Sequence, residues 1–276
     1  MTATTRILAV AAALTALSTS VGGAAASDMH AEGAKIYARY CQGCHGEKGD
    51  GQGPAAPMLI VKPRDFTKGV FKFGSTPSGT LPTTEDLYRI ITRGVYRTSM
   101  PEWSLLTERE RMAVIEYIKG LSPEWQKRGS GQPIFIPTPP TTLGSPESIA
   151  RGREVYQNLG CRACHGEHGR GDGPSALTLE PDVWGNKQKP FDFTSGRLKS
   201  GPNPQDVYRT FMVGIGGTAM PAFGDVFNAP DGETFKEGDA WHLVSYVLSL
   251  RAPAGAEQAV ASEKTVASAT VTTEKP

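Results

Sequence analysis

The stretch Cys41-Gln42-Gly43-Cys44-His45 recurs with the same spacing as Cys161-Arg162-Ala163-Cys164-His165. The two stretches contain all four cysteines of the 276-residue chain, so no thiol is left over for another site. Each has two cysteines separated by two residues, and a histidine directly follows the second cysteine. A short pattern used twice in this form predicts two sites of the same chemistry in one chain.

A Cys-x-x-Cys-His run is the attachment sequence of a c-type haem. We therefore predict two covalently bound haem c groups, with His45 and His165 as the proximal iron ligands. The predicted attachment points are Cys41, Cys44, Cys161 and Cys164. Two disulfides are the alternative in an exported chain. Zinc sites are disfavoured because the two cysteine pairs lie 120 residues apart, far outside the usual spacing.

The similarity between the two halves extends beyond the motifs. At an offset of 120 residues, nine identical residues superpose between Cys41 and Pro54 and the matching part of the second half. The offset rises to 127 where Pro63 meets Pro190, so the second half carries seven extra residues around Trp184. It then returns to 120. A tandem repeat of this length predicts two domains of roughly 100 residues each.

Two methionines occupy equivalent positions in the repeat. Met100 lies 55 residues after His45, and Met220 lies 55 residues after His165, each in a Thr-x-Met-Pro sequence. The equal spacing favours a role as second axial ligand of each iron over the core packing expected for Met58, Met112 and Met212. A thioether donor favours reduced iron, and saturated iron exchanges electrons without binding substrate. The pattern therefore predicts an electron carrier and no catalytic residues.

The apolar residues between these positions follow a helical period. We expect helices over residues 31–40, 84–93, 107–121, 151–159 and 239–250. Thr107 with Glu110 three residues later is a capping-box signature at the start of the third. The fold class expected is all-α.

The ends and the middle of the chain have other compositions. Residues 1–26 contain an apolar run from Ile7 to Leu17 and small residues before Ser27, which is typical of a cleavable secretory signal. Export predicts a periplasmic location, and we expect no transmembrane segment in the mature chain. A retained signal anchor is the alternative. The expected divisions are a first domain over 27–122, a Pro-rich linker over 123–147, a second domain over 148–251 and a disordered tail over 252–276.

The charge balance argues against a nucleic-acid partner. Removal of residues 1–26 takes away one base, Arg6, and leaves 28 basic against 28 acidic residues. Polyanion binding needs a surplus of Lys and Arg on one face, and no such run occurs. Phosphate binding by the Gly-rich loop over 46–54 is disfavoured as well, because the Gly-Lys-Ser or Gly-Lys-Thr ending is absent.

Over roughly Ala31 to Leu121 and Ser148 to Leu250, the sequence resembles bacterial class I c-type cytochromes that have two tandem cytochrome c domains. The resemblance implies a mostly helical fold in which the first and last helices of each domain cross. The small-residue and aromatic contacts of that crossing would pair Gly33 with Tyr117 and Gly152 with Tyr246. It also implies that the carbonyls of Pro54 and Pro174 accept a hydrogen bond from the proximal histidines.

The function expected is a periplasmic dihaem cytochrome that passes single electrons between a redox enzyme and a downstream acceptor, such as another cytochrome. One alternative is a catalytic dihaem enzyme of the peroxidase or thiosulfate-oxidising type. A peroxidase needs an open iron site, and relatives with a cysteine ligand are disfavoured because no cysteine is free. The other alternative is a haem subunit of a larger molybdenum-type oxidoreductase complex.

Overall fold

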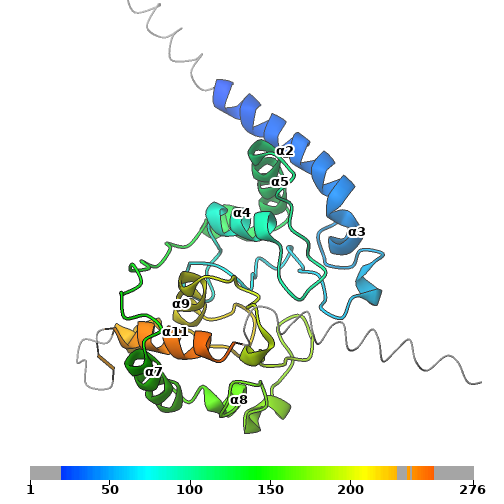
Figure 1. The fold of residues 1–276 in the computed structure, drawn as a ribbon. Helices are drawn as coiled ribbons and strands as arrows, with labels where there is room; N and C mark the ends of the chain where they lie inside the picture. The colour runs from blue at the N-terminus through cyan, green and yellow to red at the C-terminus, as the bar shows by residue number, and fades with distance from the viewer. Residues whose placement is uncertain (1–19, 229–234, 237, 252–276) are drawn as a thin grey trace, which may run out of the picture. The chain divides into compact units, whose positions relative to one another are not determined.

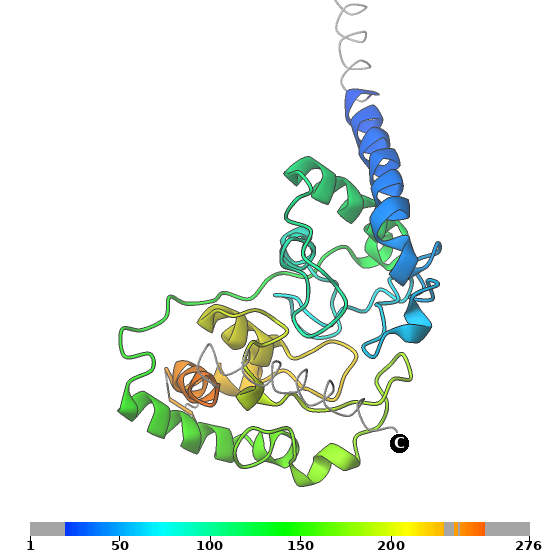
Figure 2. The same ribbon diagram turned by 45° about the vertical axis from the view of Figure 1, so that its right-hand side comes forward.

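The computed structural model describes residues 20–228, 235–236 and 238–251. The start of the predicted signal peptide, residues 1–19, and the predicted disordered tail, 252–276, lie outside the described residues. Within the described ranges all regular secondary structure is helical and no strand is formed (Figures 1 and 2). The prediction of an all-α fold is confirmed. No helix in these ranges combines the length and apolar character needed to cross a bilayer.

The chain divides into two compact units. The first contains the residues up to Val70, Thr84–Gly94 and Thr98–Ser130. The second contains Phe71–Thr83, Val95–Arg97 and the residues from Gly131 on. The second unit thus includes two segments from the first half of the sequence. The boundaries expected above follow sequence order alone and stay a prediction.

The helices of the first unit follow the predicted pattern with two differences. They are α2 (Ser20–Tyr40), α3 (Gln42–His45), η1 (Ala56–Met58), α4 (Thr84–Arg93), α5 (Glu108–Gly120) and α6 (Glu124–Arg128). The bounds of α4 are those predicted. The capping box is confirmed, because Thr107 Oγ1 accepts from Glu110 N at 3.3 Å and Thr107 N donates to Glu110 Oε2 at 2.8 Å.

The differences lie at the two ends of the unit. α2 starts eleven residues before the helix expected over 31–40, inside the segment expected as a signal peptide. α6 occupies the start of the segment expected to be an extended linker, so that expectation is wrong for residues 124–128. The four helix-forming residues Glu, Gln, Lys and Arg of α6 outweigh the prolines that follow, and Glu124 pairs with Lys127 and Arg128 one turn later.

The second unit repeats the arrangement. Its helices are α7 (Pro146–Asn158), α8 (Arg162–His165), η2 (Pro174–Leu177), η3 (Phe193–Ser195), α9 (Pro204–Val213), α10 (Gly224–Phe227) and α11 (Asp239–Ser249). α7 begins five residues before the predicted start because Ser145 caps it by accepting from Ser148 N at 3.2 Å, with Pro146 in the first turn.

In each unit the first long helix crosses the last: α2 packs against α5, and α7 packs against α11 (Figure 1). Glycine permits the close approach. A Cβ on Gly33 would overlap the carbonyl of Ala113, and a Cβ on Gly152 would overlap the carbonyl of His242. The Cβ atoms of Tyr117 and Tyr246 lie beside the same two glycines. The predicted pairing of small and aromatic residues at both crossings is confirmed.

Candidate functional sites

Each attachment motif ends on a short helix, α3 in the first unit and α8 in the second. In both, the histidine N–H donates to the carbonyl of the first cysteine at 2.9 Å. The helix stops at the next residue, because Gly46 and Gly166 both have a left-handed φ of 81°, which favours glycine. The cysteines and the histidine are therefore held by one rigid turn in each unit.

A buried tyrosine ties that turn to the preceding helix. Tyr37 Oη donates to the Gly46 carbonyl at 2.7 Å, and Tyr156 Oη donates to the Gly166 carbonyl at 2.7 Å. Both tyrosines are only 1% exposed, so the two bonds are shielded from water. The position of each motif is thus set by the helix that takes part in the crossing.

The histidine of each motif is oriented through Nδ1. His45 Nδ1 lies 3.0 Å from the carbonyl oxygen of Arg64, and His165 Nδ1 lies 3.1 Å from that of Phe191. A carbonyl can only accept, so Nδ1 carries the proton and Nε2 keeps a free lone pair for a metal. Burial is the main cause that lowers the pKa of both imidazoles below the usual range, which keeps the rings neutral at neutral pH.

The carbonyls that accept these bonds are not the ones expected. The prediction that Pro54 and Pro174 orient the histidines is wrong, because the Nδ1 atoms bond to Arg64 and Phe191 and both prolines are exposed. The accepting residues directly follow Pro63 and Pro190. That second segment can approach because Gly51 and Gly171 carry no side chain: a Cβ on either would press against the backbone of the facing proline.

A phenylalanine stacks on each histidine, and sequence reasoning missed both. The rings of His45 and Phe66 lie 4.5 Å apart at 19°, and those of His165 and Phe193 lie 4.5 Å apart at 20°. The preceding aspartate fixes each turn by accepting from the backbone N–H of the threonine that follows, at 2.9 Å in both units. The signal was present as the Asp-Phe-Thr repeated at an offset of 127.

None of the four cysteines is in a disulfide, and each is partly buried. The alternative of two disulfides is therefore not what the structure forms. Burial raises the pKa of Cys41 and of Cys161 to about 12, so both thiols are neutral at neutral pH. In the part of the chain that the structure describes, no cluster of three His, Cys, Asp or Glu side chains is arranged to hold a metal ion.

The two candidate ligand methionines lie in loops of the same construction. Met100 N donates to Thr98 Oγ1 at 3.0 Å, and Met220 N donates to Thr218 Oγ1 at 3.2 Å. Each loop is closed behind the methionine, where Trp103 N donates to Ile91 O at 3.1 Å and the equivalent bond, Phe223 N to Phe211 O, is 2.9 Å. Both methionines are partly buried. Their role as iron ligands stays a prediction.

The residues around the second motif fit a haem. Met220, Cys161, Phe191 and Phe193 all pack against one buried cluster of apolar side chains that includes Trp241. Two thiols can attach a haem covalently, and a neutral imidazole and a thioether sulfur can ligate its iron. The first unit offers the same set of groups. Cys41 and Cys44 would bind the first haem covalently, and Cys161 and Cys164 the second.

Comparisons with known proteins agree with this arrangement. Residues 28–118 match the family model described as Cytochrome C oxidase, cbb3-type, subunit III, and residues 149–251 match the model described as Cytochrome c. Each match contains one attachment motif. A solved chain of the reducing HAO-like protein complex of Kuenenia stuttgartiensis is 40% identical; the similarity covers 80% of this chain and 96% of that chain, with a TM-score of 0.73. A search of curated proteins found no match.

Proposed function

The chain belongs to the c-type cytochromes, with two tandem cytochrome c domains and two covalently bound haem c groups. We propose that it carries single electrons in the periplasm between a redox enzyme and a downstream acceptor. A bound haem c supplies one reversible electron at its iron. The observation that carries the proposal is the histidine held through Nδ1 in the same way in both units. Two matched sites of this kind suit electron transfer.

The chain's own residues set the ligation. In the proposal, His45 and Met100 are the axial ligands of the first iron, and His165 and Met220 those of the second. The Nδ1 hydrogen bond and the stacked phenylalanine restrain rotation of each imidazole, which keeps Nε2 aimed at one point. If His and Met both ligated each iron, no position would be left for a substrate. This favours a carrier over a peroxidase or a thiosulfate-oxidising enzyme.

Spectroscopy of the oxidised holoprotein tests the ligands. We expect a sulfur-to-iron charge-transfer band from both haems. Met100→Ala and Met220→Ala should each remove about half of that band and lower one reduction potential, since loss of the thioether removes the donor that favours reduced iron. Met58→Ala is the matched control, because Met58 is 79% exposed and has no methionine at the equivalent position. A high-spin haem in the resting wild-type protein would favour a catalytic role instead.

The similarity to a chain of an HAO-like protein complex supports a finer proposal about the partner. We propose that this protein works as a haem subunit of a larger oxidoreductase assembly of that kind, in place of the molybdenum-type complex considered above. Affinity purification from the native periplasm should recover a large redox enzyme together with the chain. Recovery of the chain alone, at the size of a single copy, would contradict it.

A further inference from the structure

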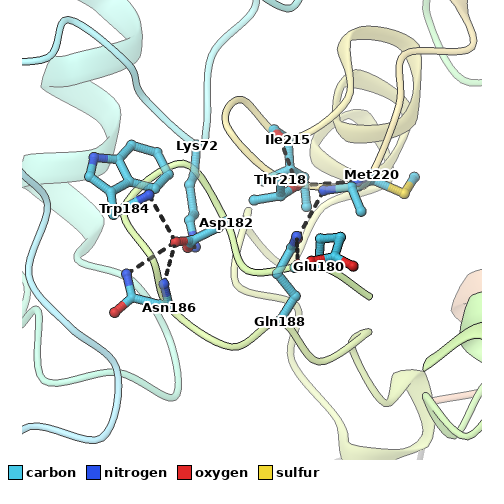
Figure 3. Close-up of polar contacts among 10 residues, drawn as sticks. Lys72, Glu180, Asp182, Trp184, Asn186, Gln188, Ile215, Thr218 and Met220 are labelled. Atoms are coloured by element: carbon cyan, nitrogen blue, oxygen red, sulfur yellow. Dashed lines mark hydrogen bonds and ion pairs between the residues drawn. The ribbon is translucent and has the colours of Figure 1, made fainter. Parts of the chain in front are cut away.

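The seven extra residues of the second half belong to a loop, residues 178–189, that is organised around Asp182 (Figure 3). Oδ1 of this carboxylate accepts from Trp184 N at 3.1 Å and from Asn186 N at 2.9 Å. Oδ2 pairs with Lys72 Nζ at 3.0 Å. The Asp182 side chain is 2% exposed, so this ion pair is shielded from solvent. The insertion loop is therefore a rigid element of the second unit.

This loop holds the backbone of residues 215–220, the loop that carries Met220. Gln188 Oε1 accepts from Ala219 N at 2.8 Å, directly before the methionine. The same amide donates through Nε2 to the Glu180 carbonyl at 2.6 Å, which fixes its orientation (Figure 3). Val183 N donates to the Gly217 carbonyl at 3.1 Å. Two hydrogen bonds thus connect the insertion loop to the methionine loop.

Lys72 and Trp184 also contact the loop that carries Met220. The indole of Trp184 packs on Gly217, where any Cβ would lie 2.7 Å from the ring. The Lys72 ammonium lies 5.5 Å from the Trp184 ring centroid, and the Lys72 carbonyl accepts from Gly216 N at 3.3 Å. The methionine loop is therefore braced at Gly216, at Gly217 and at Ala219.

The first half lacks the insertion that forms this brace. Pro63 follows Pro54 by nine positions, whereas Pro190 follows Pro174 by sixteen. We propose that the insertion loop, with Gln188 as the key positioning residue, holds the Met220 loop in place and so makes methionine ligation of the second iron harder to displace. The inference rests on the proposed axial role of Met220.

Displacement of the methionine ligand by an added ligand makes the effect of the insertion loop measurable. An added ligand such as imidazole reaches the iron only when the methionine loop moves away, and this movement breaks the bond from Ala219 N to Gln188. Loss of one hydrogen bond of ordinary strength changes an equilibrium by about fivefold. Gln188→Met removes both amide bonds and keeps the length of the side chain. Lys187→Met is the matched control on the exposed neighbouring residue.

The experiment is an imidazole titration of the oxidised holoprotein, followed through the sulfur-to-iron band. The two phases are assigned with Met100→Ala and Met220→Ala. Each phase gives the imidazole concentration that displaces half of one methionine ligand. Gln188→Met should lower that concentration for the second haem by about fivefold and leave the first haem unchanged. Lys187→Met should change neither phase.

Amide hydrogen exchange provides an independent measurement. Ala219 should exchange faster in Gln188→Met, and Lys72→Met should shift both measurements in the same direction by less. Suppose that Met220→Ala removes half of the sulfur-to-iron band, but Gln188→Met changes neither the imidazole concentration of the second phase nor the exchange rate of the Ala219 amide. Only the proposed role of the insertion loop is then overturned. If Met220→Ala leaves the band intact, the axial assignment and the proposed role of the insertion loop are both overturned.

Discussion

The two units secure the same helix crossing with ion pairs of opposite polarity. In the first, Arg109 on the closing helix α5 pairs with Glu32 on α2, with Nη2 to Oε2 at 2.9 Å. In the second, Arg151 on the opening helix α7 binds Asp239 on α11 through two bonds of 2.8 and 2.6 Å. The side chain of Arg109 is 66% exposed and that of Asp239 is 3% exposed. The repeat therefore preserves the backbone crossing while the charges that flank it are interchangeable.

The equivalent tyrosines Tyr88 and Tyr208 show the same contrast in the cores. Tyr88 Oη accepts from Arg111 Nη2 at 2.6 Å, and the guanidinium lies 4.9 Å from the ring centroid. Tyr208 instead stacks on Trp241, with ring centroids 4.6 Å apart. The first core thus uses a buried polar contact at a position where the second uses aromatic packing. Of the described buried apolar side chains, more lie in the second unit than in the first.

Loss of haem attachment should have the largest effect on this comparison. We expect the variant with all four cysteines replaced by serine to show no cooperative unfolding, because small cores bury too little apolar surface alone. Cys41→Ser/Cys44→Ser should remove more helical circular dichroism than Cys161→Ser/Cys164→Ser, since the second unit keeps its aromatic cluster. A cooperative, native-like transition in the haem-free chain would contradict the prediction.

The helix crossings should give the next largest effect. Gly33→Ala and Gly152→Ala each place a methyl group against a backbone carbonyl, and overpacking of this kind costs about 3 kcal/mol. Each should destabilise its own unit in thermal unfolding of the holoprotein. Gly43→Ala is the control: no atom lies within 4 Å of its added Cβ, and the equivalent residue is Ala163. Equal losses in all three variants would argue against tight crossings.

Asp239→Asn should destabilise the second unit by about 2 kcal/mol, the size expected for hydrogen bonds to a charged group. Burial opposes ionisation of Asp239, but the bonds from Arg151 and from Lys236 N outweigh it and hold its pKa below the usual value. The ion pair therefore contributes fully above the unfolded pKa of about 3.9 and is lost as pH falls below it. The free energy of unfolding, measured against pH, should fall at acid pH in the wild type and fall less in Asp239→Asn.

The buried tyrosine hydroxyls test whether the two motifs are truly equivalent. Tyr37→Phe and Tyr156→Phe each remove a hydrogen bond to the glycine that ends the motif, and each should cost about 1 kcal/mol in denaturant unfolding. The expected result is two equal losses. A loss confined to one unit would show that the turns are supported differently.

Arg109→Ala should have the smallest effect, about 0.5 kcal/mol on the first unit, because its ion pair is exposed to solvent. The effect should shrink further in high salt, which screens exposed charges. A salt-independent loss as large as that of Asp239→Asn would remove the difference between the two ion pairs.

Local signals in the sequence were sufficient for part of the fold and of the sites. The bounds of α4 and the cap at Thr107 follow from residues close together in the chain. The glycines of both crossings followed from the resemblance to tandem cytochrome c domains. The carbonyls that orient the histidines did not follow. Arg64 and Phe191 lie 19 and 26 residues after their histidines. The family resemblance instead implied the carbonyls of Pro54 and Pro174.

The sequence by itself therefore indicated the covalent chemistry, since a histidine directly follows both Cys-x-x-Cys pairs and these pairs contain all four cysteines. It also determined the two-fold repeat and its helical class. Only the tertiary structure decided which carbonyl holds each histidine, which phenylalanine stacks on it and how Gln188 meets Ala219. These contacts join segments that approach each other only through packing of the whole unit. Every residue carries a backbone carbonyl, so residue type alone does not indicate which carbonyl accepts a given hydrogen bond.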